Sequence, residues 1–212
     1  TNKGHSFEYG HLINCTGQYS DVVSKVFNVG KKYTLLPFKG LYYGLNKNSN
    51  IRLNGLIYPV PDLNVPFLGI HSVKLVDGSV YFGPTAVPAF GREHYQGFKG
   101  VNIKDATSIS YHLLRQYISN KQGFRSYTHQ EMHRFLKSEF LKSMQKLIPK
   151  LSNSDLVVSE KAGIRAQLLD TKSNELVMDF LVERVDNTTH VLNAVSPAFT
   201  SAFSFAKYIL NK

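Results

Sequence analysis

The segment 35–82 constrains the fold more than any other part of the chain. Three runs in it are rich in Tyr, Phe, Val and Ile and are punctuated by prolines: Leu35–Leu45, Gly55–Val60 and Phe67–Val76. Asp77-Gly78 separates the third run from Val80–Phe82, a pattern typical of a two-residue hairpin turn between strands. Strands joined so locally predict an antiparallel or mixed sheet.

Two helical patterns follow this sheet. Lys104–Ile118 has its apolar residues at helical spacing. Thr128-His129-Gln130-Glu131 has the Thr-x-x-Glu form of a capping box and precedes a periodic apolar run that Pro149 ends. The sequence therefore predicts one helix over 104–118 and a second, capped helix over 128–148.

The sequence predicts a strand and a helix at each end of the chain. At the start, a strand over His11–Gly17 precedes a helix over 19–27, capped by Ser20 or Asp21 and stopped at Gly30. At the end, Ser196 serves as N-cap and Pro197 as first residue of a helix to about Leu210. Further strands are expected between the helices: Leu156–Val158, Ile164–Leu169, Val177–Arg184 and Thr189–Ala194. The fold class is α+β, with a largely antiparallel mixed sheet flanked by helices.

Cysteine and hydropathy limit the class of protein. Cys15 is the one cysteine among 212 residues, which excludes a disulfide framework and a multi-cysteine zinc site and favours a reducing compartment. It lies in an apolar strand pattern, where we expect a small buried side chain. No apolar run reaches the roughly 18 residues of a membrane span, and the start is polar rather than a secretory leader. The chain begins in mid-fold without Met, so we expect it to be part of a larger protein.

Positive charge is concentrated on one helical segment. Residues 101–150 hold nine Lys and Arg against three Asp and Glu, whereas residues 151–212 hold six against seven. Such a face can meet nucleic acid or an anionic membrane surface. Because no zinc finger or RNA-binding aromatic motif accompanies it, we expect a solvated face and no nucleic-acid partner.

Most familiar catalytic motifs are absent from the sequence. It contains no G-x-S-x-G elbow, Walker loop, H-E-x-x-H or complete G-x-G-x-x-G. His129 and His133 have the spacing of a two-histidine metal site, but they lie among Lys and Arg, so we interpret them as surface residues and expect no metal. Arg165 stands inside an apolar strand, where it must either pair with an acid or await a carboxylate ligand.

Five segments together carry a resemblance to a known family. They are NCTGQYSD at 14–21, PFKGLYYGL at 37–45, GLIYPVPDLNVPFLGIHSVKLVDGSVYFGPTAV at 55–87, AGIRAQ at 162–167 and HVLNAVSPAFTSA at 190–202. In order and spacing they resemble the C-terminal half of the L-2-hydroxyglutarate dehydrogenase/oxidase family. That family is one of the FAD-dependent oxidoreductases of the D-amino-acid-oxidase and glycine-oxidase type.

The resemblance implies a two-domain flavoenzyme and divides this chain accordingly. Residues 1–34 and 161–212 would belong to a Rossmann-like FAD-binding domain, and residues 35–160 would form the substrate-binding domain. Gly17, Gly163, Ser196 and Pro197 would lie against FAD. The family's G-x-G-x-x-G turn has no counterpart here, so the chain would correspond to a fragment lacking the nucleotide-binding half.

The resemblance also implies a reaction, the oxidation of L-2-hydroxyglutarate to 2-oxoglutarate with FAD as cofactor. His71 is the candidate base for the hydroxyl proton, with a histidine outside this chain as an equal alternative. Arg165 would hold a substrate carboxylate, and Tyr58 and Gln167 would orient the second carboxylate or the hydroxyl. The electron acceptor is oxygen, a quinone or an electron-transfer protein. The expected location is the cytoplasm or, peripherally, the inner membrane, which in a eukaryote is mitochondrial.

Other functions remain open on the sequence alone. Another flavoenzyme of the same superfamily, acting on an amino acid or glycerol phosphate, would share Arg165 but not the 55–87 block. A truncated, non-catalytic module is the alternative outside enzymes.

We predict that the 212-residue chain alone folds without binding FAD. The dinucleotide's pyrophosphate normally rests on a Gly-rich turn and the helix behind it, and this chain offers only Gly17 and the segment at Ser196. The visible spectrum of the chain purified with excess FAD measures this. Stoichiometric bound flavin, or turnover of L-2-hydroxyglutarate, would contradict the prediction.

Overall fold

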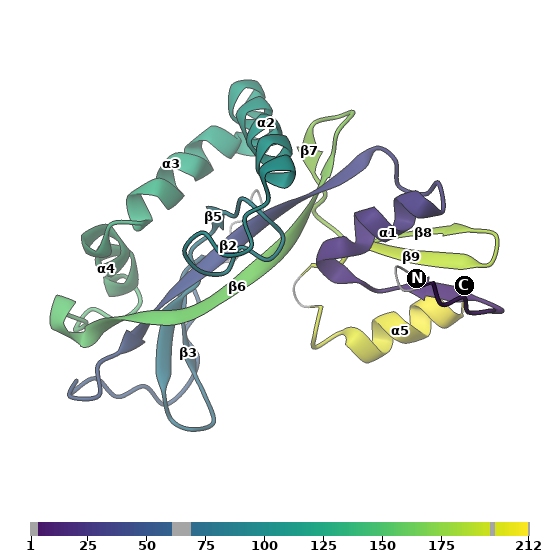
Figure 1. Ribbon diagram of the computed structural model, residues 1–212. Helices are drawn as coiled ribbons and strands as arrows, with labels where there is room; N and C mark the ends of the chain where they lie inside the picture. The colour runs from purple at the N-terminus through teal and green to yellow at the C-terminus, as the bar shows by residue number, and fades with distance from the viewer. Residues whose placement is uncertain (1–3, 61–68, 196–197, 212) are drawn as a thin grey trace. The chain divides into compact units, whose positions relative to one another are not determined.

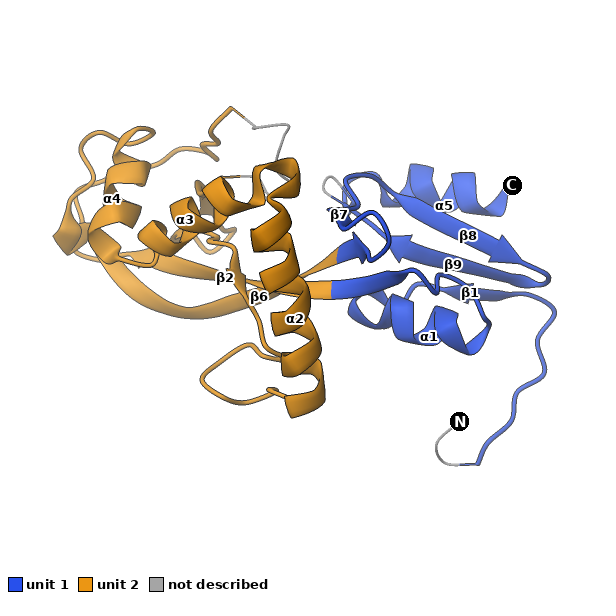
Figure 2. Cartoon of the chain, turned by 90° about the horizontal axis from the view of Figure 1, so that it is seen from above, with its two compact units in different colours: residues 1–35, 168–212 blue, residues 36–167 orange. Residues whose placement is uncertain are grey.

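The computed structural model describes residues 4–60, 69–195 and 198–211. The chain divides into two compact units, shown in Figure 2: residues 1–35 with 168–212, and residues 36–167. We refer to them as unit 1 and unit 2. The boundary between the units falls within two long strands, β2 (Tyr33–Leu45) and β6 (Leu156–Asp170).

The larger sheet has six strands, with the path β3-β4-β2-β6-β7 and β5 paired to β2, and most of its strands lie in unit 2. The pairs β2–β4, β3–β4, β2–β5 and β6–β7 are antiparallel, as the locally joined strands predict. The remaining strands of this sheet are β3 (His71–Lys74), β4 (Val80–Gly83), β5 (Val87–Pro88) and β7 (Glu175–Leu176). The α+β fold class is therefore confirmed.

Three helices follow one face of the long strands of unit 2 (Figures 1 and 2). They are α2 (Ile103–Ser119), α3 (Phe124–Arg134) and α4 (Lys137–Gln145), accompanied by short 3₁₀ turns at Lys121–Gly123 and Asn153–Asp155. The core beneath them includes Phe82, Phe140 and Met144, each 0% exposed. The helix predicted over 104–118 is confirmed.

The predicted helix over 128–148 is wrong in its start and in its continuity. The helix α3 begins at Phe124, directly after Gly123, whose φ is +68°. Thr128 therefore lies inside the helix, and its hydroxyl donates a hydrogen bond to the Phe124 carbonyl instead of capping the N-terminus. The chain then breaks at Leu136, whose extended backbone (ψ 126°) separates α3 from α4. The break lets Phe140 and Met144 enter the core while Leu136 stays 59% exposed.

The hairpin at Asp77-Gly78 is confirmed, but its turn is longer than two residues. The Leu75 amide donates to the Ser79 carbonyl at 2.8 Å, which leaves three residues in the loop. Gly78 adopts φ +85°, and the Asp77 carboxylate accepts from the Ser79 amide at 2.9 Å. A three-residue loop with a glycine in the left-handed region is the next most common hairpin connection. The expected strand over 55–60 contributes only an isolated bridge, between Ile57 and Ser72.

Unit 1 is a three-stranded sheet with a helix on each face (Figures 1 and 2). Its strand order is β1-β9-β8, with β1 parallel and β8 antiparallel to β9. The elements are β1 (Leu12–Asn14), a 3₁₀ turn (Gly17–Tyr19), α1 (Ser20–Val26), β8 (Leu181–Val185), β9 (Thr188–Asn193) and α5 (Ala202–Leu210). Helices on both faces of a sheet with a parallel pair are typical of nucleotide-binding layers.

Three expectations for unit 1 are wrong. Neither Ser20 nor Asp21 caps α1: the Ser20 hydroxyl donates to the Leu192 carbonyl, and the Asp21 carboxylate accepts from the Leu35 amide. Cys15 is exposed, because β1 ends at Asn14. The last helix begins at Ala202, after Ser201, and not at the predicted Ser196-Pro197, which lies outside the described residues.

A buried histidine joins the first and last parts of unit 1. His190, 0% exposed, has its Nδ1 3.1 Å from the side-chain amide nitrogen of Asn14 and its Nε2 3.0 Å from the Thr188 hydroxyl oxygen. The amide nitrogen can only donate, so His190 Nδ1 accepts and Nε2 carries the proton. Burial lowers the pKa of His190, and the charge of Glu183 partly opposes this.

We predict that His190 makes unit 1 sensitive to mild acid. Its pKa in the folded state lies below the unfolded value of about 6.5, so the unfolded state takes up the proton first as the pH falls. The contribution to stability is complete above pH 6.5 and is lost as the pH falls to the folded pKa, by at most about 1.4 kcal/mol per pH unit. Urea unfolding between pH 5 and 8 gives the free energy of unfolding of wild type and H190Q at each pH. The same dependence of this free energy on pH in both proteins would contradict the prediction.

Candidate functional site

His71 and Tyr58 are brought together in unit 2. His71, at the start of β3, is 8% exposed, and its ring stacks on that of Tyr58 with centroids 4.4 Å apart and planes at 28°. His71 Nδ1 lies 2.9 Å from the carbonyl oxygen of Gly69. Because a carbonyl only accepts, Nδ1 carries the proton and Nε2 keeps its lone pair. The ring is therefore fixed in the tautomer that a general base needs.

The surroundings of His71 also keep it neutral. Burial lowers the pKa of His71, the hydrogen bond to Gly69 partly offsets this, and the positive charge of Arg165 lowers it further. At neutral pH the imidazole is consequently uncharged and able to take up a proton.

Arg165 and Gln167 lie two residues apart on β6, so their side chains leave the same face of the strand. Gln167 is 5% exposed. Burial lowers the pKa of Arg165, while its interactions with Tyr127, Tyr42 and Glu131 favour the charged form. A guanidinium remains charged at neutral pH even so, and it can bind a carboxylate through two parallel hydrogen bonds.

Three polar residues of α3 that the sequence motifs did not mark as site residues lie in this region: Tyr127, Glu131 and Arg134. Glu131 is 5% exposed, accepts from the Ala86 amide at 2.7 Å and pairs with Arg134, whereas the sequence assigned it to a helix cap. Burial, together with the charge of Glu131, raises the pKa of Tyr127, which therefore stays protonated. Their spacing of four and three residues places them on one helix face, a signal that the sequence did contain.

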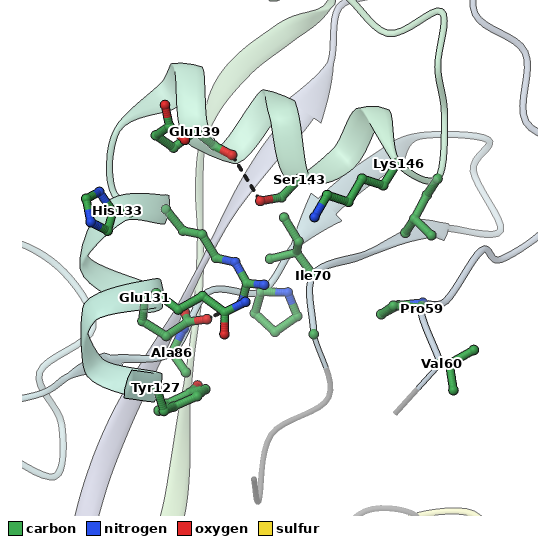
Figure 3. A pocket seen from close by; sticks show the side chains of 15 residues that line it. Pro59, Val60, Ile70, Ala86, Tyr127, Glu131, His133, Glu139, Ser143 and Lys146 are labelled. Carbon is green, nitrogen blue, oxygen red and sulfur yellow. Dashed lines mark hydrogen bonds and ion pairs between the residues drawn. The ribbon is translucent and has the colours of Figure 1, made fainter. Parts of the chain in front are cut away.

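The three residues of α3 line a cavity of about 610 Å³ (Figure 3), whereas His71, Tyr58, Arg165 and Gln167 are not among its lining residues. One wall consists of Pro59 and Val60, next in sequence to Tyr58, and of Gly69 and Ile70, which precede His71. The other walls come mainly from α3 and α4 and the segment between β4 and β5: Pro84, Ala86, Tyr127, Gln130, Glu131, His133, Arg134, Glu139, Ser143, Lys146 and Leu147. The cavity thus combines apolar wall segments beside the histidine with charged groups from two helices.

The predicted cofactor residues are placed in different units. Gly17 opens the 3₁₀ turn after β1 in unit 1 with φ +57°, and Gly163 is an exposed residue of β6 in unit 2. A Cβ atom at either position would meet nothing within 4 Å. Both positions therefore leave room for a ligand to approach the backbone closely. Ser196 and Pro197 lie outside the described residues.

Two further features bear on function. Over residues 4–60, 69–195 and 198–211 no three His, Cys, Asp or Glu side chains gather as metal ligands, and His129 Nε2 instead lies 2.8 Å from the Tyr117 hydroxyl. Within the same ranges no helix combines the length and apolar character that crossing a membrane requires.

Comparison with known proteins gives a consistent result. A family model described as "DAO: FAD dependent oxidoreductase" matches residues 1–211. L-2-hydroxyglutarate dehydrogenase of Escherichia coli K12 is 37% identical over 213 residues, covering 100% of this chain and 49% of the relative. The protein of that name from Indibacter alkaliphilus is 40% identical (96% and 50% covered), and the mitochondrial one from Mus musculus is 38% identical (98% and 45%). The chain spans about half the length of the curated relatives it matches.

A solved structure supports the fold alone. Dithionite-reduced L-alpha-glycerophosphate oxidase from Mycoplasma pneumoniae with FAD bound superposes with a TM-score of 0.52, covering 94% of this chain and 41% of that one. The two sequences are 15% identical over the match.

Proposed function

The chain belongs to the DAO family of FAD-dependent oxidoreductases, and we propose that it forms about half of an enzyme that oxidises L-2-hydroxyglutarate to 2-oxoglutarate, with the substrate-binding domain and parts of the FAD-binding domain. The observation that carries the proposal is His71, a buried neutral imidazole whose Nδ1 is tied to a carbonyl and whose Nε2 is left to accept a proton. The names of the relatives supply the substrate.

In this proposal residues 35–160 form the substrate-binding domain, and residues 1–34 and 161–212 belong to the FAD-binding domain. The open backbone at Gly17, at a positive φ directly after a strand of a sheet with helices on both faces, suits close approach of a flavin nucleotide. Gly163, with open space around it, is the second proposed contact, and Ser196 and Pro197 complete the set on the strength of the sequence. When bound, FAD supplies the acceptor for the two electrons and hydrogen that leave C2.

The chain's own residues would position the substrate and move one proton. Arg165 binds the carboxylate next to C2 through two parallel hydrogen bonds and so fixes the orientation of the C2–H bond. His71 Nε2 takes the hydroxyl proton as the carbonyl of the product forms. Tyr58, stacked on that ring, and Gln167, on the same strand face as Arg165, would orient the hydroxyl or the second carboxylate.

Two alternatives follow from the same fold. An amino acid or glycerol phosphate would also need a cationic residue such as Arg165, and the glycerophosphate oxidase shares the fold at 15% identity. A non-catalytic module would need none of this geometry. Assaying the complete protein with L-2-hydroxyglutarate, an amino acid and glycerol phosphate separates these possibilities, since a non-catalytic module would oxidise none of them.

We predict that R165K weakens substrate binding while leaving FAD content unchanged. Lysine keeps the charge but loses the planar fork, so the apparent affinity should fall by roughly 1.5–3 kcal/mol, on the order of a ten- to hundredfold rise in KM. R125K is a matched control, because Arg125 is exposed and bonds to the carbonyls of Tyr117 and Ile118. An unchanged KM in R165K would remove Arg165 from the substrate site.

We predict that H71Q lowers the rate of substrate oxidation by roughly 10²–10⁴, the usual worth of a general base, while substrate still binds. In wild type, kcat/KM should fall as the pH drops below the His71 pKa, because the protonated ring cannot accept a proton. H71Q should lose that limb of the pH profile, and H129Q, at an exposed histidine, should keep it. Flavin reduction at the normal rate by H71Q in a single turnover would place the base elsewhere.

We further propose peripheral contact of unit 2 with an anionic membrane. Apolar side chains stand exposed on α2 and α3, among them Leu114 (60%), Ile118 (67%) and Met132 (67%), with Phe135 (65%) directly after α3. The segment 101–150 that carries them has six more basic than acidic residues. Exposed apolar side chains combined with Lys and Arg are typical of interfacial helices. Membrane contact would suit a quinone as electron acceptor, with oxygen and an electron-transfer protein as the alternatives to compare in the assay.

We predict that the protein co-floats with vesicles containing phosphatidylglycerol but much less with pure phosphatidylcholine. The double variant M132S/F135S should reduce flotation severalfold, since it removes apolar side chains that would enter the interface. F199S, at a side chain that is 94% exposed in unit 1, is the matched control. Equal flotation of all three proteins would contradict contact through this face.

A further inference from the structure

The acidic residues of the cavity beside His71 are already neutralised. Glu131 pairs with Arg134, and Glu139 pairs with Lys142 at 2.6 Å. Figure 3 shows Glu131 on α3 and Lys146 near the end of α4, both lining the cavity. Because these carboxylates are paired, the basic side chains of the lining determine which charge of ligand the cavity favours.

Two of these basic side chains can still bind an anion. Among the described residues, Lys146 Nζ has no carboxylate within ion-pair distance, although its side chain lines the cavity. The Nε–H of Arg134 is buried and meets no hydrogen-bond acceptor in the described part of the chain, even though Nη1 pairs with Glu131. A buried donor without a hydrogen-bond partner is unfavourable, so an anion that accepts from it would be favoured.

Residues next to His71 and Tyr58 line the cavity, although these two side chains do not. Gly69 and Ile70 of its wall precede His71, and the Gly69 carbonyl accepts from the His71 ring. Pro59 follows Tyr58, which stacks on the same ring. A substrate held at His71 by its hydroxyl could thus extend a short carbon chain into this cavity.

We propose that Lys146 and Arg134 form a subsite for the carboxylate farther from C2, so that this cavity selects a dicarboxylic 2-hydroxy acid over a monocarboxylic one. The inference rests on the proposed function and deepens it. Arg165 would bind the carboxylate beside the reacting carbon, and the subsite would bind the carboxylate at the other end. The chemistry is that of any carboxylate: two oxygens that accept from a point-like ammonium and from a guanidinium N–H.

The test compares Lys146 with Lys150 in the complete enzyme. K146M removes the proposed ligand contact, and K150M is the matched control, because Lys150 is an exposed lysine that does not line the cavity. For L-2-hydroxyglutarate, K146M should raise KM at least about tenfold, K150M should change it less than twofold, and K146R should restore a KM close to that of wild type. For L-2-hydroxypentanoate, which has the same chain length without the second carboxylate, K146M and wild type should be alike.

A binding readout separates this inference from the proposed function. Calorimetric titration with glutarate, which needs no turnover, should show similar affinity for wild type and K150M and about tenfold weaker binding to K146M. If wild type does not oxidise L-2-hydroxyglutarate but glutarate binding depends on Lys146, the proposed function fails and the carboxylate subsite stands. If K146M matches K150M in both KM and glutarate binding, the subsite is overturned whatever the reaction.

Discussion

The buried carboxylate of Glu131 is the interaction on which the arrangement of unit 2 depends. It accepts the Ala86 amide from the segment after β4, pairs with Arg134 on its own helix, and favours the charged form of Arg165 on β6. A buried ion pair adds little stability in itself, but removing one partner leaves an uncompensated charge that costs roughly 3–5 kcal/mol. Glu131 therefore links helix, loop and strand, and it helps to stabilise the half-buried guanidinium of Arg165, where a carboxylate ligand is proposed to bind.

The histidine of the site depends on a different constraint, the direction of one hydrogen bond. The Gly69 carbonyl fixes the proton on Nδ1 of His71, and stacking on Tyr58 fixes the plane of the ring. Burial and the charge of Arg165 then keep the ring neutral. The same arginine thus has two effects, since the charge that suits it to bind a carboxylate also favours the basic, unprotonated state of its neighbour.

Unit 1 uses its buried polar groups for structure. Asn14 accepts from the amide and hydroxyl of Thr16 while its amide nitrogen donates to the Ser20 carbonyl and to His190. These bonds hold the turn that leads to Gly17, where the backbone enters the left-handed region and stays open to a ligand. Glycine suits this position because a side chain would be strained at that φ.

Features that depend on neighbouring residues could be predicted without a structure: the hairpin at Asp77-Gly78, the helix over 104–118, the long strand over 35–45, the α+β class and, through the sequence motifs, membership of the family. The sequence also singled out His71 and Arg165, because a titratable or charged group among apolar strand residues is visible without a structure. The start of α3 and the break after it depend on packing, since Phe140 and Met144 reach the core only if the helix ends before Leu136. The tertiary structure alone revealed that Glu131 is a buried partner and not a cap, because its acceptor bond to Ala86 joins residues 45 positions apart and leaves no local pattern in the sequence.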